Sequence, residues 1–312
     1  MNDPRVSVVV TTRNESRNIG NCLESIKAQT YPAQLLEIIV VDNQSTDNTK
    51  AIASRYTSLV FDKGPERSAQ RNFGFTKATG ELFMFLDADM ILSAGVVARC
   101  VARMRGEGLC ALYITEIVLG KGFFPAVRRF ERSFYDGTVI DCVRIFTREA
   151  FQAVGGFDET LTGPEDWDFD KRIRNHGPIG VLSDYDFDVL DAYVSTLPEA
   201  GFLERLTGFE KRSGHDVPLL FHNEAAFDLW RYLTKKTYYG GSFAAYTAKW
   251  PADDPDIRRQ LGMPYRFFGV FLESGRWQRL LTHPRLAFGM YFLRFLVGAM
   301  FIVGKLKGSR DT

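Results

Sequence analysis

The sequence has few cysteines and almost no net charge. Only four of its 312 residues are cysteine, and none forms a CxxC pair or stands beside a histidine at metal-ligand spacing. This predicts reduced, buried thiols in an interior compartment, and neither disulfides nor a zinc site. The formal net charge is +1 and no basic stripe is interleaved with aromatic residues, so the sequence argues against nucleic acid as a partner.

Glycine-rich phosphate motifs are also absent, since neither GxGxxG nor GxxxxGK[ST] occurs in the chain. A Rossmann dinucleotide site and a P-loop are therefore excluded, because each needs those glycines to hold phosphate. The apolar run near the N-terminus has only five residues and follows an acidic residue. It is too short for a signal peptide, and we expect no secretion by that route.

The sequence does contain alternating strand and helix patterns. Residues 6–10 and 35–41 are short, β-branched apolar runs, which indicates strands covered on both faces. Between them, Ile19, Cys22 and Ile26 belong to an apolar stripe at helical spacing. Further elements are expected at 44–56, 66–80, 82–86, near 110–118, at 143–147 and from Glu165. This order predicts a doubly wound α/β fold with a mainly parallel sheet flanked by helices.

The pattern changes after about residue 221. Strand signals end there, and apolar, basic and aromatic helical segments continue toward the C-terminus. We therefore expect an α/β domain over residues 1–220 and a helical C-terminal region over 221–312.

Polar residues follow each early strand, at 11–15, 42–47 and 87–89. Ligands bind outside the carboxyl ends of parallel strands, so these three segments should meet in one crevice. Without phosphate-binding glycines, a divalent cation on Asp87 and Asp89 is the obvious means of holding phosphate, and their hard oxygen ligands suit Mg²⁺ or Mn²⁺. An isolated pair of this kind could also simply cap a turn.

Five stretches of the chain resemble the family 2 glycosyltransferases with the GT-A fold. They are VSVVVTTRNESRNIGNCLESIKAQTYP, EIIVVDNQSTDNT, ERSAQRNFGFTKATGELFMFLDADM, AVGGFDE and GPEDWDFDKRIRNHG, and together they cover about residues 5–177. The resemblance implies a Rossmann-like GT-A sheet. It also implies an inverting, metal-assisted transfer of the hexosyltransferase type, from a nucleotide-sugar donor to a hydroxyl of a glycan or lipid-linked acceptor.

The resemblance also implies where the donor and the metal bind. Thr11 and Glu15 lie where the family holds the nucleotide, and Asp42 lies where it contacts the base. Asp87 and Asp89 fall on the DxD motif of the family. Asp89 is then the direct ligand of Mn²⁺ or Mg²⁺, and Asp87 contributes to the metal and donor site.

Further implied roles concern the transfer itself. Glu165 and Asp166 fall on the acidic ED motif, where Asp166 would be the catalytic base, although acids are also common at helix N-termini. Arg67 and Arg71 precede the DxD strand and could reach the donor phosphates or could form a solvated helix face. His222 lies in a segment similar to the one after the family core, and we expect it near the metal or the acceptor.

Two other classes of function remain open. A sugar-phosphate nucleotidyltransferase could use a similar sheet, but it usually has a loop rich in glycine and basic residues after the first strand, which TTRNES is not. A non-catalytic glycan-binding or assembly protein of the same fold would be expected to lack one or more of the acidic site residues. All five acids are present, namely Asp42, Asp87, Asp89, Glu165 and Asp166.

The segment 286–304 has nineteen residues with one charge, Arg294, and basic residues flank it on both sides. Its length is adequate for a spanning helix, and a central arginine would cost about 2.5–3.5 kcal/mol. The alternative is a helix buried in the protein's own core or in a dimer interface. We favour membrane contact, either through one helix or peripherally, on the cytoplasmic side of the membrane.

Overall fold

The computed structural model describes residues 3–183, 185–196, 218–239, 242–273 and 275–308. The apolar run after Arg5 forms its central strand β1, Val6–Thr12. β1 pairs in parallel with β2, Leu36–Asp42, and with β4, Leu82–Asp87. The side chains of these strands are buried on both faces along much of their length, as continuous apolar runs predict.

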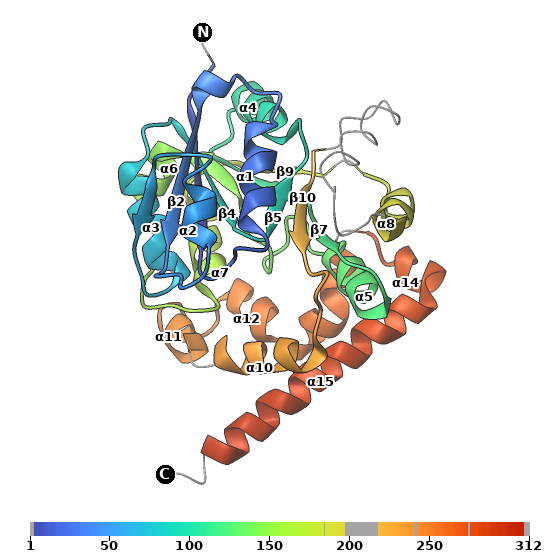
Figure 1. Cartoon of the computed structure of the whole chain (residues 1–312). Helices are drawn as coiled ribbons and strands as arrows, with labels where there is room; N and C mark the ends of the chain where they lie inside the picture. The colour runs from blue at the N-terminus through green and yellow to red at the C-terminus, as the bar shows by residue number, and fades with distance from the viewer. Residues whose placement is uncertain (1–2, 184, 197–217, 240–241, 274, 309–312) are drawn as a thin grey trace.

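The main sheet has seven strands in the order β3-β2-β1-β4-β8-β6-β9 (Figure 1). The outer strands are β3 (Val60–Asp62), β6 (Ala111–Ile114), β8 (Ile145–Thr147) and β9 (Ile179–Leu182). Strand β8 runs antiparallel to both β4 and β6, whereas the other pairs are parallel. The predicted α/β fold with a mixed, mainly parallel sheet is therefore confirmed.

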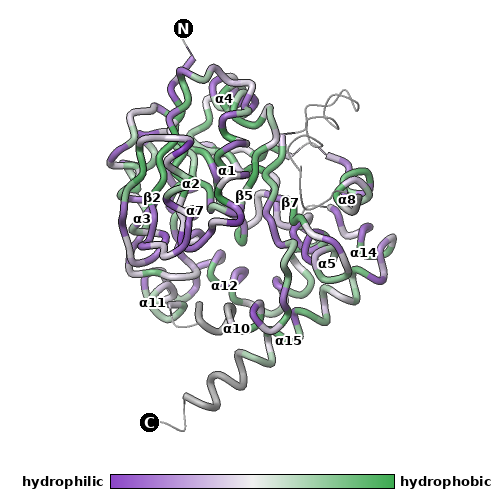
Figure 2. The backbone as a smooth tube through the Cα atoms, viewed as in Figure 1, coloured by the Kyte–Doolittle hydropathy of each residue, from purple (hydrophilic) through white to green (hydrophobic). Residues whose placement is uncertain are grey.

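Helices cover both faces of this sheet, and Figure 2 shows hydrophobic residues gathered in its central strands. The helices are α1 (Ile19–Lys27), α2 (Thr49–Ala53), α3 (Arg67–Lys77), α4 (Val96–Glu107), α6 (Arg148–Val154) and α7 (Glu165–His176). Val8 and Val10 pack in one core cluster with α1 and α4, and Val9 packs in another with α3, α6 and α7. Gly74 lets α3 approach β1, because a Cβ there would lie 2.4 Å from Val9 Cγ1.

A second sheet has three strands in the order β5-β10-β7. They are β5 (Met90–Leu92), β7 (Glu116–Leu119) and β10 (Leu220–Asn223), so β10 crosses the predicted boundary between residues 220 and 221. Strand signals therefore do not end at residue 221. The single strand expected near 110–118 is instead two strands in different sheets, because the chain leaves the main sheet at Thr115.

Helical segments form most of the remaining described structure, and several lie at the carboxyl edge of the main sheet (Figure 1). They are α5 (Phe123–Arg132), α8 (Phe187–Thr196), α10 (Leu229–Tyr239), α11 (Phe243–Ala248), α12 (Pro255–Leu261), α13 (Val270–Glu273), α14 (Gln278–Thr282) and α15 (Pro284–Gly308), with short turns η1 (Ala33–Leu35) and η3 (Tyr265–Gly269). Arg174 of α7 pairs with Asp256 of α12 at 2.9 Å, which ties this region to the sheet domain.

The predicted membrane segment lies within α15. Among the residues that the structure describes, no helix has the length and apolarity needed to span a bilayer. Arg294 is 9% exposed; its Nε donates to Glu131 Oε1 at 2.9 Å and its Nη2 to the Tyr135 hydroxyl at 2.7 Å. The lone charge of the segment therefore pairs with a buried acid of α5.

This pairing predicts that Arg294→Leu destabilises the fold. The substitution removes a charged partner from buried Glu131, although Arg128 still pairs with that carboxylate. We expect the free energy of unfolding to fall by about 1.5–3 kcal/mol, measured by urea unfolding followed by circular dichroism. Arg285→Leu, an exposed arginine of the same helix, is the control and should change stability by less than about 0.5 kcal/mol. Equal stability of both variants would contradict the role given to the pair.

Candidate active site

The carboxyl ends of β1, β2 and β4 bring three predicted site residues together. Thr11 Oγ1 donates to Asp87 Oδ1 at 3.0 Å across the β1–β4 pair. Asp42 ends β2 and is fully buried; its Oδ1 accepts from the Ser45 amide at 2.6 Å, whereas its Oδ2 has no hydrogen-bond partner in the described part of the chain. An orphaned carboxylate oxygen suits a donor group of a bound ligand, such as the N–H of a nucleobase.

Glu15 lies just beyond β1, before α1. Its amide donates to Thr49 Oγ1 at 2.8 Å, and its Oε2 accepts from Asn18 Nδ2 at 2.6 Å. These contacts hold the backbone and the carboxylate of Glu15 between the starts of α1 and α2. Its predicted part in nucleotide binding stays a prediction.

Asp89 lies in the turn between β4 and β5, opposite His222 on β10. His222 Nε2 is 3.0 Å from Asp89 Oδ2, and His222 Nδ1 is 2.9 Å from Glu116 Oε1. Burial alone would lower the pKa of His222, but the charge of Asp89 and the bonds to both acids outweigh it and raise this pKa well above its ordinary value. The structure thus places His222 beside the predicted metal ligand.

The arrangement of Asp87 and Asp89 suits a cation whose other ligands come from water and a bound substrate. Asp89 Oδ1 is buried with no partner among the described residues, whereas both Asp87 oxygens already accept from Thr11, Arg67 or Arg71. Nowhere in the described ranges do three or more acidic, histidine or cysteine side chains form a group able to hold a metal by themselves. Mg²⁺ typically binds one or two carboxylates and completes its shell with water and substrate phosphate. Asp89 is the best-suited ligand of this kind.

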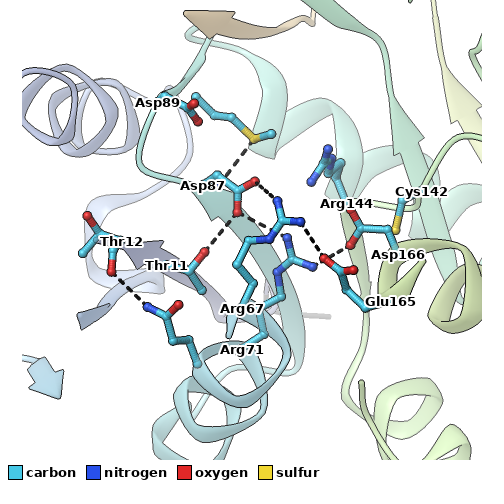
Figure 3. Close-up of polar contacts among 12 residues, drawn as sticks. Thr11, Thr12, Arg67, Arg71, Asp87, Asp89, Cys142, Arg144, Glu165 and Asp166 are labelled. Atoms are coloured by element: carbon cyan, nitrogen blue, oxygen red, sulfur yellow. Dashed lines mark hydrogen bonds and ion pairs between the residues drawn. The ribbon is translucent and has the colours of Figure 1, made fainter. Parts of the chain in front are cut away.

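Arg71 connects the DxD segment with the ED segment (Figure 3). Its side chain is fully buried; Nη1 donates to Asp166 Oδ1 at 2.5 Å and Nη2 to Asp87 Oδ1 at 3.2 Å. The guanidinium also lies over the Phe85 ring, at 4.1 Å from its centroid, and near that of Phe157 at 5.0 Å. Arg71 was expected to reach the donor phosphates. Here its guanidinium is occupied by two carboxylates, and phosphate contact would require those pairs to open.

Glu165 and Asp166 begin α7 and face the same group of arginines. Arg67 Nη2 donates to Glu165 Oε1 at 2.7 Å, while Arg67 Nη1 lies 3.5 Å from Asp87 Oδ2. Burial raises the pKa of Glu165 despite the charge of Arg67. Burial would also raise the pKa of Asp166, but the charges of Arg71 and Arg144 outweigh it and lower this pKa. Asp166 is thus ionised at neutral pH and able to accept a proton.

Sequence reasoning missed Glu116 and Arg144, which join the two sides of the crevice. Arg144 Nη2 donates to Glu116 Oε2 at 3.0 Å, and its charge acts on Asp166, which it neighbours in Figure 3. Glu116 in turn contacts His222. Each is a lone charge inside an apolar run predicted as a strand, and a charge buried in that way requires a partner. That signal could have revealed both residues.

Comparisons with known proteins show which proteins this chain resembles. Residues 7–154 match the family model described as glycosyl transferase family 2. Glycosyltransferase AglE of Haloferax volcanii is 30% identical over 190 residues, which are 56% of this chain and 62% of that protein. The uncharacterized glycosyltransferase YibD of Escherichia coli is 35% identical over 91 residues, covering 27% and 26% of the two chains.

A solved structure shows the same fold. The mannosyltransferase PcManGT from Pyrobaculum calidifontis, in complex with GDP-Man and Mn²⁺, matches 100% of this chain and 89% of its own at a TM-score of 0.59 and 19% identity. This match supports the fold alone, and the chain spans less than two thirds of the length of the curated relatives above. The fold is that of a GT-A-type protein. Residues 7–154, just under half of the chain, are similar to glycosyl transferase family 2.

The orphaned oxygen of Asp89 predicts metal-dependent nucleotide binding. In calorimetric titrations of UDP and GDP, wild-type protein with Mn²⁺ should bind one of them at least about tenfold more tightly than protein with EDTA, because loss of groups around a metal typically costs 10–100-fold. Asp89→Asn should abolish that difference. Asp62→Asn, at the exposed end of β3, is the matched control and should behave like wild type. Equal affinity of wild type and Asp89→Asn, with and without Mn²⁺, would exclude the metal site.

Proposed function

We propose that this protein is an inverting glycosyltransferase that moves a sugar from a nucleotide-diphosphate donor to an acceptor hydroxyl with the help of Mn²⁺ or Mg²⁺. The observation that carries the proposal is the position of Asp166. This carboxylate lies one arginine away from Asp87, which supports a site where the proposed proton acceptor lies near the strand ends proposed to bind the donor.

The chemistry requires two things of such a site. The attacking hydroxyl has to lose its proton, and Asp166 serves as the general base for that step. The leaving diphosphate develops negative charge, which a divalent cation bound at Asp89 would stabilise as a Lewis acid. Thr11, Glu15 and Asp42 are then the residues that hold the nucleotide, and Glu165 supports the base through Arg67.

Direct attack by the acceptor predicts the stereochemistry. A single displacement inverts the anomeric centre, whereas retention usually needs a carboxylate nucleophile. Because Asp166 is paired with Arg71, we assign it the role of base and not of nucleophile. The acceptor that we propose is a glycan or lipid-linked hydroxyl, used on the cytoplasmic side of a membrane.

The first test combines Asp166→Asn with a donor panel. The amide fills the same space but cannot accept a proton, so transfer should fall by about 10²–10⁴-fold while donor binding is retained. UDP-, GDP- and dTDP-sugars are incubated with Mn²⁺ and candidate acceptors, and nucleotide release and product anomers are measured. Release of pyrophosphate from a nucleoside triphosphate and a sugar phosphate would instead identify a nucleotidyltransferase. Turnover of Asp166→Asn within about tenfold of wild type would place the base elsewhere.

The pH dependence provides a second test. The lowered pKa of Asp166 predicts that kcat/KM stays level from neutral pH downward and declines only in the acid range, where the base becomes protonated. Arg144→Gln removes one of the charges that lower this pKa, so the acid limb should move to higher pH. The control is Arg148→Gln, a half-buried arginine whose side chain donates to the carbonyls of Ala78 and Gly80. An unchanged acid limb in Arg144→Gln would contradict the assignment.

A further inference from the structure

Helix α15 is apolar on the side that packs against the protein and also on the side that faces solvent. Ala287, Met290 and Leu293 are buried in a cluster with residues of α5. Gly289 permits this close contact, since a Cβ there would lie 2.5 Å from Val127 Cγ2 and 2.6 Å from the ring of Phe123. A surface helix normally presents polar residues on the opposite side, and α15 does not.

Three phenylalanines occupy that opposite side. Phe288, Phe292 and Phe295 follow one another at helical spacing and are 72%, 41% and 68% exposed, respectively. The rings of Phe288 and Phe292 are stacked with centroids 6.5 Å apart, and Phe123 of α5, 37% exposed, lies at the N-terminal end of the row. Contiguous exposed aromatic side chains on a folded protein indicate a surface that is covered by a membrane or by another molecule.

Basic residues border this row. The guanidinium of Arg285 lies 5.5 Å from the centroid of the Phe123 ring and forms no ion pair with any described residue, and Lys121, two positions before Phe123, is exposed. Between residues 275 and 308 the sequence contains six lysines or arginines and no aspartate or glutamate. Arg276 and Arg294 pair with Asp136 and Glu131, whereas Arg285 presents an exposed positive charge beside the aromatic row.

We propose that Lys121, Phe123, Arg285, Phe288, Phe292 and Phe295, here called the α15 surface, dock the protein on an anionic lipid bilayer. Phenylalanines of an interfacial helix enter the boundary between headgroups and acyl chains, while lysine and arginine contact acidic headgroups. A protein partner with an acidic, apolar surface is disfavoured, because nothing in the row offers directional hydrogen bonds for specific recognition. The inference is independent of the transferase activity.

The α15 surface belongs to the part of α15 that packs on α5, and α15 runs along the outside of the molecule (Figure 1). The helix remains attached to the body through Arg294 and Glu131. Docking therefore requires no helix to leave the fold, and it differs from the spanning arrangement by placing α15 along the bilayer surface. Attraction of this kind has a salt-sensitive part from the cations and a salt-resistant part from the aromatic side chains.

The test is flotation of the full-length chain with vesicles of phosphatidylcholine alone or mixed with phosphatidylglycerol. Wild-type protein should float with the mixed vesicles, partly resist high salt, and bind phosphatidylcholine alone at least about tenfold more weakly. Phe288→Ser combined with Phe295→Ser should abolish flotation, and Arg285→Glu should weaken binding to the mixed vesicles by about tenfold. All replaced side chains are exposed, so melting temperatures should match wild type.

Two matched controls distinguish binding through this surface from nonspecific binding of the protein to vesicles. Val189→Ser removes an exposed apolar side chain of α8, and Arg99→Glu reverses an exposed charge on α4; both should float like wild type. Wild type that stays unbound with mixed vesicles, or a double phenylalanine variant that floats normally, would overturn the proposal. So would a concentration-dependent dimer that the double variant loses in light scattering, since the surface would then join two copies of the chain.

Discussion

The arrangement of the candidate site depends on one buried arginine between two carboxylates. Asp87 ends β4 and Asp166 lies in the first turn of α7. Without a cation between them, the charges of these partly buried carboxylates would repel each other. Arg71 lies between both, with no exposed surface and a phenylalanine ring against its guanidinium. Its position follows from the packing of α3 on β1, which Gly74 permits. A packing constraint on one helix therefore helps to fix the distance between Asp87 and Asp166.

The sequence was sufficient to predict the parts of the fold whose signal is local. Long apolar runs and helical periodicity located β1, β2, β4 and the helices between them, and the direction of the strands followed from their alternation with helices. Strands β3, β5, β9 and β10 were missed, because three or four residues carry little pattern and their pairing depends on distant partners. The pairing of β10 with β5 and β7, for example, joins residues more than 100 positions apart.

The candidate site could be predicted to the same extent. Parallel strands end at one edge, so the meeting of Thr11, Asp42 and Asp87 followed from the fold class. The pairing of Glu116 with Arg144 did not, because two lone charges in different strands reveal their partnership only when the register is known. Arg294 shows the same limit: a charge within an apolar helix suits both lipid and a buried acid, and only the packing of α15 on α5 distinguishes them.

The packing of α15 on α5 also constrains the position of the candidate site relative to the proposed lipid contact. Gly289 and Arg294 attach α15 to α5, and Arg128 of α5 pairs with Glu224, which directly follows β10. β10 carries His222, the neighbour of Asp89. A bilayer that contacts the outward phenylalanines of α15 would therefore be linked to Glu224 through the ion pairs of Arg294 with Glu131 and of Arg128 with both acids. From Glu224 the link to the turn of Asp89 continues through the backbone of β10 and the contact of His222. Because breaking such a pair costs several kcal/mol, the crevice would be held at a fixed height above the lipid surface, which suits an acceptor whose hydroxyl is itself fixed at the headgroup level.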